Sequence, residues 1–187
     1  MSTLHRTARK HLPAGGGGGQ AMVEFAFTVA LLLVLVCASI DFGRALSTMQ
    51  LIDELTRQGS MLASRGDLLP QAVTAVINGE SGLNLADKGE VIITSVTNEN
   101  GKYLITGQTS STDTGQTKLS NSSKIGTGVG TDVTGTVPNA ADGALQPGQT
   151  LFVTEIYYTF APITPIGNLL QESAVTLPPL LYTAAYF

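Results

Sequence analysis

The residue types most suited to chemistry lie close to the amino terminus. Gly19 ends a run of five glycines, and Glu24 stands five positions later, at the start of an apolar stretch. A glycine run is flexible and disfavours helix, so it would offer a protease an extended substrate. A cut after Gly19 would leave Gln20 as a new amino terminus, whose α-ammonium group is cationic near neutral pH. That cation would be the natural partner of the Glu24 carboxylate, because a carboxylate in a membrane helix needs a compensating charge.

The apolar stretch predicts one membrane-spanning segment over residues 21–40. Residues 25–40 hold no charge, and adding residues 21–24 gives the roughly 20 residues that a helix needs to cross a bilayer. Residues 1–19 carry three basic and no acidic residues, whereas residues 20–187 carry seven basic and fourteen acidic residues. Because flanking basic residues stay on the cytoplasmic side, we expect a single-pass protein of the cytoplasmic (inner) membrane. Its amino terminus would lie inside and its carboxyl-terminal part outside.

A secretory signal peptide and a lipoprotein anchor fit the same apolar stretch less well. The apolar region of a signal peptide normally has about 7–15 residues and ends in a small-residue cleavage site. Here the run is longer, and the only candidate cleavage site, at residues 37–39, is followed directly by helix-like sequence. A lipoprotein anchor at Cys37 is disfavoured because residues rich in Leu and Val precede the cysteine.

The same helix is expected to continue well beyond the membrane. No proline occurs between Asp41 and Arg65, and Gly66 is a suitable helix stop. Asp41 and Arg44 stand three residues apart, which favours a local ion pair. Gly43 between them would allow close helix packing, as small residues do in membranes. Apolar residues recur at helical spacing and predict a face that packs on a small domain. That face comprises Leu46, Met49, Ile52, Leu55 and Leu62.

Residues 67–187 predict a small β-rich domain outside the membrane. Two β-branched runs at 91–96 and 102–106 flank an Asn-Gly pair, which is typical of a β-hairpin. Residues 151–160 predict a further strand. Residues 107–137 are rich in Gly, Ser, Thr and Asn, a composition typical of a long flexible loop. The remaining expected elements are a short helix or turn at 70–78 and a last strand at 180–187 that packs on the long helix. Together they make an α+β fold, with a long amino-terminal helix packed on a small antiparallel sheet.

The composition argues against an enzyme, a metal centre and a nucleic-acid binder. The single cysteine, Cys37, excludes an intrachain disulfide and a Cys-based zinc site. Both histidines precede Gly19, so a chain cut there would have no His-based triad or metal site. Asp113, Asp132 and Asp142 are too far apart for a calcium loop, and the glycine runs lack the Gly-Lys-Ser/Thr ending of a phosphate loop. A net charge of −4 disfavours nucleic acid. We therefore expect no catalytic residues, no metal, no cofactor and no small-molecule substrate.

Residues 15–66 resemble the amino-terminal part of a type IV prepilin. The match is carried by the sequence GQAMVEF, residues 19–25, which follows a basic leader, and by IDFGRA, residues 40–45. Within that superfamily the chain is similar to the TadE-like family, the minor pseudopilins of tight-adherence (Flp) pili. Residues 153–170 also resemble the end of TadE-like chains. Gln20 stands where most of the superfamily has Phe, but it fits the TadE-like branch. The second motif supplies Asp41, Phe42, Gly43 and Arg44.

The resemblance implies a pilin-like chain of three parts. These are a basic, Gly-rich leader at 1–19, the long helix at 20–66 and an extracytoplasmic domain at 67–187. It implies cleavage after Gly19 by a prepilin peptidase, after which Glu24 would neutralise the new amine of its own or a neighbouring subunit and set the axial register. The implied partners are the peptidase, the major pilin and other minor pseudopilins. The implied role is pilus biogenesis, adhesion or secretion, with incorporation into a surface pilus.

An alternative from another class is an unprocessed, single-pass, membrane-anchored binding module. In that hypothesis the 107–137 loop contacts a surface ligand. The two hypotheses differ at Glu24: replacing it with alanine would permit cleavage but impair assembly of a pseudopilin. The same change would be neutral or stabilising in an anchored module.

Overall fold

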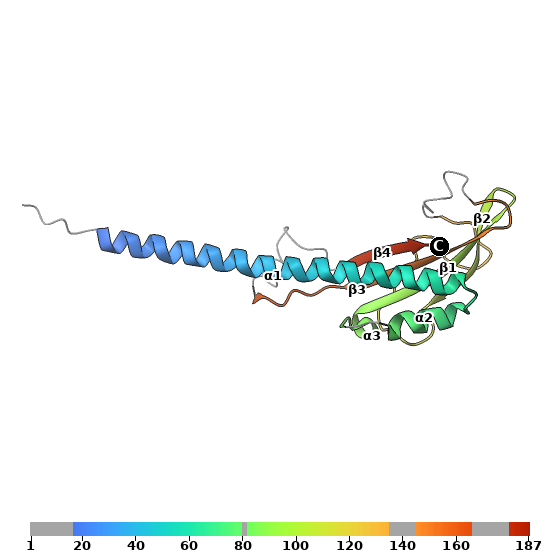
Figure 1. Cartoon of the computed structure of the whole chain (residues 1–187), viewed down its shortest axis with the longest axis horizontal. Coiled ribbons are helices and arrows are strands. Elements are labelled where there is room, and N and C mark those ends of the chain that lie inside the picture. The colour runs from blue at the N-terminus through green and yellow to red at the C-terminus, as the bar shows by residue number, and fades with distance from the viewer. Residues whose placement is uncertain (1–16, 80–81, 135–144, 166–179) are drawn as a thin grey trace, which may run out of the picture.

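The computed structural model describes residues 17–79, 82–134, 145–165 and 180–187. Its longest element is helix α1 (Gly17–Ser64), whose first half projects away from the remainder of the chain and whose second half packs on a small domain (Figure 1). The structure therefore confirms the expected α+β arrangement of a long amino-terminal helix on a small antiparallel sheet.

The domain is built on a four-stranded antiparallel sheet with the strand order β2-β1-β3-β4. Strands β1 (Gly89–Glu99) and β2 (Lys102–Ser110) form the expected hairpin and are longer than predicted. Asn100 and Gly101 between them both have positive φ, as a tight hairpin turn with the twist of the sheet requires. The other two strands are β3 (Thr150–Thr159), which pairs with β1, and β4 (Leu180–Tyr186), which pairs with β3.

Two helices pack side by side on one face of this sheet. Helix α1 lies on β3 and β4, and α2 (Leu69–Asn78) lies on β1 and β2. Pro70 stands in the first turn of α2, where its missing N–H costs nothing. A third helix, α3 (Leu85–Lys88), precedes β1 and was not expected; its first turn is capped by Asn84, whose side chain accepts a hydrogen bond from the Asp87 N–H.

The face of α1 that contacts the sheet differs from the expected apolar face. Ile52 and Leu55 are buried and Leu62 packs against the core, but Leu46 and Met49 are exposed. Small residues occupy most of the other buried positions and bring the helix backbone close to β3. A Cβ atom at position 59, which is a glycine, would lie 2.8 Å from the nearest side-chain atom of β3. The small residues of this face are Ala45, Gly59, Ser60 and Ala63.

The other face of the sheet is covered by the segment that was expected to be a flexible loop. Residues 107–110 belong to β2, and residues 111–134 are irregular but are hydrogen-bonded to the sheet at several points. Ile125 is fully buried there against Val96 and Val153. Residues 130–133 also pair with the outer edge of β2. The low-complexity composition did not predict these contacts.

Candidate functional site

The largest exposed feature of the structure is the first half of α1. This helix is long and apolar enough to cross a membrane, and no part of its most apolar 18-residue window is buried by the described remainder of the chain. Phe25, Phe27 and Leu32 are typical of this surface, with exposed fractions of 68%, 73% and 60%. A continuous apolar surface of this length requires lipid or other apolar helices around it. The exposed helix, with the residues at its two ends, is therefore the candidate functional site.

The predicted cleavage point lies in the first turn of this helix. Gly17 to Gly19 are helical, so this part of the glycine run is not extended as expected; the rest of the run lies outside the described residues. A Cβ atom at Gly19 would meet nothing within 4 Å, and Gln20 is exposed. Each helical glycine costs about 1 kcal/mol relative to alanine, and a terminal turn has few hydrogen bonds to lose. This turn can therefore unwind at little cost into the extended form that a protease binds.

Glu24 lies one turn further along the helix and is exposed. Its carboxylate accepts a hydrogen bond from the side-chain amide of Gln20, with 3.0 Å between Nε2 and Oε1. The Thr28 hydroxyl donates to the backbone carbonyl of Glu24 at 2.8 Å and so does not contact the carboxylate. Among the residues that the structure describes, Glu24 takes part in no ion pair. Its side-chain partner among the described residues is a neutral amide, so no charge in that part of the chain compensates the carboxylate.

Asp41 marks the other end of the exposed apolar stretch, and it is buried, with 3% of its surface exposed. Its carboxylate accepts hydrogen bonds from the Ile163 N–H at 3.0 Å, from the Thr164 N–H at 3.3 Å and from the Thr164 hydroxyl. These donors belong to the chain that follows β3 and runs back beside α1 (Figure 1). Asp41 thus ties that segment to the helix at the point where the apolar stretch ends.

The predicted ion pair between Asp41 and Arg44 is not formed. The described ion pairs lie elsewhere, and the Asp41 carboxylate instead binds backbone N–H groups and a hydroxyl from a distant segment. The Arg44 guanidinium lies over the ring of Phe160, 5.8 Å from its centroid. Phe42 is 54% exposed, and a Cβ atom at Gly43 would meet nothing within 4 Å. The helix-motif residues therefore separate into one buried anchor and three positions that face outward.

Two further carboxylates are completely buried and were not singled out from the sequence. Glu90 on β1 accepts hydrogen bonds from Ser110, Thr112 and Asn121. Glu155 on β3 accepts a hydrogen bond from the Tyr182 hydroxyl at 2.9 Å. It also accepts hydrogen bonds from the Ser123 hydroxyl and the Lys124 N–H. Both carboxylates lie on the sheet face opposite α1, and they fasten the irregular segment to it. In the sequence, each appears only as an acidic residue within a run of β-branched residues. A strand with one exposed face shows the same pattern, so the sequence did not indicate that these carboxylates are buried.

Burial raises the pKa of the Tyr182 hydroxyl far above its usual range, and the adjacent Glu155 charge and its hydrogen bond raise it further. The pKa of Tyr157 is also raised, first by burial and then by the charge of Glu155. Both hydroxyls are therefore held protonated, and each serves as a hydrogen-bond donor, Tyr157 to the Ser122 carbonyl at 2.9 Å. This cluster fixes the fold of the domain and offers no reactive group.

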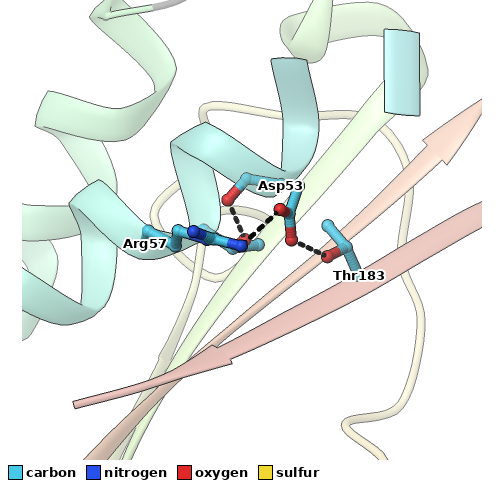
Figure 2. Close-up of polar contacts among 4 residues, drawn as sticks. Asp53, Arg57 and Thr183 are labelled. Carbon is cyan, nitrogen blue, oxygen red and sulfur yellow. Dashed lines mark hydrogen bonds and ion pairs between the residues drawn. The ribbon is translucent and has the colours of Figure 1, made fainter. Parts of the chain in front are cut away.

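A shallow cavity of about 440 Å³ lies where α1 meets β4, beside the polar contacts of Asp53 that Figure 2 shows. Asp53 and Arg57 on its wall form an ion pair of 3.0 Å, and the Thr183 hydroxyl donates to the other Asp53 oxygen at 3.2 Å. The two charges satisfy each other, so this contact docks the helix on the edge strand. Among the described residues, no group of three His, Cys, Asp or Glu side chains could hold a metal ion.

Comparison with known proteins identifies the same helix. Residues 19–61 match the model of the family described as TadE-like protein. No curated protein and no solved structure matches the chain. The family match begins at the predicted cleavage site, includes Glu24 and Asp41, and ends inside α1 before the sheet begins. The chain is therefore similar to the TadE-like family along nearly the whole of its long helix, as the sequence resemblance indicated.

Proposed function

We propose that this chain is a minor pseudopilin of a tight-adherence (Flp) pilus system, stored in the cytoplasmic membrane and cut after Gly19 by a prepilin peptidase. A TadE-like segment that contains an exposed apolar helix fits a membrane protein associated with a Tad pilus. The observation that carries the finer proposal is the state of Glu24, a carboxylate with a neutral partner at the start of a helix that has to be surrounded by apolar material.

Cleavage would supply the missing charge at the right place. Hydrolysis of the Gly19–Gln20 bond leaves an α-ammonium group four residues before Glu24, within one turn of α1. In an apolar surrounding, the attraction between that cation and a carboxylate is much stronger than in water. A neighbouring subunit whose helix lies alongside could offer its own ammonium to the same carboxylate, which would fix the axial position of one helix against the next. The same cut removes the basic leader and with it the charge that holds the amino terminus inside.

The domain supports this role through its position. It lies at the carboxyl end of α1, so a helix inserted with its amino terminus inside presents the sheet on the outer side (Figure 1). The proposed partners are the prepilin peptidase, the major pilin and other minor pseudopilins, and the proposed role is pilus biogenesis, adhesion or secretion. The alternative of an unprocessed anchored binding module assigns ligand contact to the 107–137 loop, and the described part of that loop is hydrogen-bonded to the sheet.

The test is the amino terminus of the protein in membranes of its native host, together with a pair of matched variants. Intact mass should show a chain that begins at Gln20. Glu24→Gln should be cut normally but should be lost from the assembled pilus fraction. Glu54→Gln is the control, because Glu54 is exposed on the same helix and accepts the same type of hydrogen bond, from the side-chain amide of Gln58 at 3.1 Å. An intact Met1 in cells whose peptidase processes the major pilin would refute the proposal.

A further inference from the structure

The segment after β3 brings an exposed apolar side chain to the end of the membrane helix. Asp41 holds the backbone of Ile163 and Thr164 against α1, and the Ile163 side chain is 62% exposed. Ile40 and Phe42 flank Asp41 on the helix, about 100° to either side, and their exposed fractions are 47% and 54%. The hydrogen bond to Asp41 places the backbone of Ile163 on the Asp41 side of the helix, between the directions of Ile40 and Phe42. Ile40, Phe42 and Ile163 therefore lie around α1 at one level, and we call them the apolar collar.

The collar lies at the height where a bilayer would end. Residues 21–40 span about 30 Å at 1.5 Å per residue, which matches the thickness of the hydrocarbon core. The collar follows within two residues of that point, so it is continuous with the apolar surface of the helix. Isolated exposed apolar residues are ordinary on a protein surface. Three of them around one helix at the predicted edge of the hydrocarbon form a specific arrangement.

The surroundings of the collar suit a lipid interface. No residue from Ile156 to Pro165 is charged, and prolines at 162 and 165 restrict the backbone on both sides of Ile163. Arg44 stands one turn further from the membrane, exposed and stacked over Phe160, at the level where lipid phosphates would lie. Arginine and aromatic side chains are the usual residues of that layer. The change from apolar side chains at the collar to a cation one turn further on matches the change from hydrocarbon to lipid phosphates at a bilayer surface.

We propose that the apolar collar rests in the outer interface of the membrane, so that the domain is seated on the lipid at a fixed height. Asp41 is the anchor that keeps Ile163 in the collar. Helix α1 is continuous through this level, so a seated domain also has a fixed orientation relative to the bilayer. This inference rests on the proposed membrane insertion of α1. Separate probes test whether the collar contacts lipid and whether α1 inserts into the bilayer.

The experiment uses the full chain in phosphatidylcholine and phosphatidylglycerol vesicles, with a polarity-sensitive fluorophore at one cysteine at a time. The background is Cys37→Ala, which removes the single native cysteine. The collar probe is Ile163→Cys, and the insertion probe is Leu32→Cys in the middle of the apolar segment. The matched control is Leu68→Cys, because Leu68 is equally exposed, at 66%, but follows the far end of α1. That end is about 35 Å from Asp41 along the helix.

A lipid that carries a quencher near its headgroup should remove most of the emission at position 163. The same lipid should leave position 68 unchanged, and a deep quencher should remove the emission at position 32. Adding Asp41→Ala should abolish the quenching at 163 alone. If position 163 behaves like position 68 while position 32 is quenched, the seat is refuted and the insertion stands. If position 32 is not quenched, both proposals fail. A blue-shifted but unquenched probe at 163 would mean that protein, such as a second copy, covers the collar, and it would also overturn the proposal.

Discussion

Removing the Asp41 carboxylate should release the segment after β3 from the helix while the sheet stays folded. The carboxylate accepts two backbone N–H groups and one hydroxyl, all from residues 163 and 164. Hydrogen bonds to a charged group contribute about 1.5–3 kcal/mol each, but three bonds to one carboxylate are not additive. The N–H bond at 3.3 Å is also long, and water can replace part of the loss after release. We therefore expect Asp41→Ala to lower the free energy of opening this segment by about 3 kcal/mol.

The direct measurement is amide hydrogen exchange at residues 163 and 164 in the full chain. A loss of about 3 kcal/mol corresponds to exchange that is faster by about 100-fold, at roughly 1.4 kcal/mol per factor of ten. Asp41→Asn should give a smaller effect, because its amide oxygen still accepts one N–H but carries no charge. Tyrosine fluorescence reports whether the domain remains folded, since all five tyrosines lie in it and none in α1.

Asp53→Ala is the control for this prediction. Asp53 lies on the same helix twelve residues further on, and its ion pair with Arg57 is about half exposed. Exposed pairs contribute about 0–1 kcal/mol, so its loss should leave the exchange at residues 163 and 164 unchanged. If Asp41→Ala exchanges no faster than Asp53→Ala at those two amides, the buried carboxylate is not the anchor and the reasoning is wrong.

Three further predictions concern the stability of the folded chain and can be measured by chemical unfolding in detergent micelles. Gly43→Ala should stabilise the chain by about 0.5–1 kcal/mol, because alanine favours helix and its Cβ would meet no atom within 4 Å. Gly59→Ala should instead destabilise the chain by about 1–2 kcal/mol, because its Cβ would clash with β3. Equal effects of the two substitutions would contradict the close packing of α1 on β3. The free energy of unfolding should fall as the pH rises above about 10, because the fold raises the pKa of Tyr157 and Tyr182 and the unfolded chain lets both ionise at their ordinary pKa. A free energy of unfolding that stays constant between about pH 9 and 11 would contradict this prediction. Glu155→Ala should cost about 3 kcal/mol, because it leaves three partly buried donors without their acceptor, and unchanged stability would show that water replaces the carboxylate.

The elements that sequence analysis predicted well are those that depend on neighbouring residues. The hairpin followed from an Asn-Gly pair between two β-branched runs, and both turn residues have the positive φ that this pair supplies at low cost. The continuation of α1 beyond its apolar segment followed from an unbroken helical pattern up to Gly66, which has a φ of 95°. In each case the local preference and the final fold agree.

The contacts that were missed depend on residues far apart in the chain. Asp41 was expected to pair with Arg44 three residues away, but its partners lie more than 120 residues further on. Backbone N–H groups compete well for a buried carboxylate, because they add no desolvated charge of their own. The buried face of α1 was missed for a related reason. Its alanine, glycine and serine residues carry little hydrophobic signal, yet they allow the closest approach to the sheet.

The two carboxylates of α1 divide the tasks of the helix between its two ends. Glu24 and Asp41 are 17 residues apart, about 26 Å along the axis, so they flank the apolar segment. Asp41 has its hydrogen bonds supplied by its own chain and therefore needs nothing from a neighbouring subunit. Among the described residues, Glu24 has the Gln20 amide as its side-chain partner, so in an apolar environment it gains most from a nearby cation. Under the proposed function, the carboxylate that needs a cation is thus Glu24, at the end of the helix where cleavage creates an α-ammonium group. The height of the domain above the membrane is then set by Asp41, and the position of the subunit among its neighbours by Glu24. A variant that exchanged the two environments, with a satisfied carboxylate at 24 and an unsatisfied one at 41, would retain the charge of the helix but lose both functions.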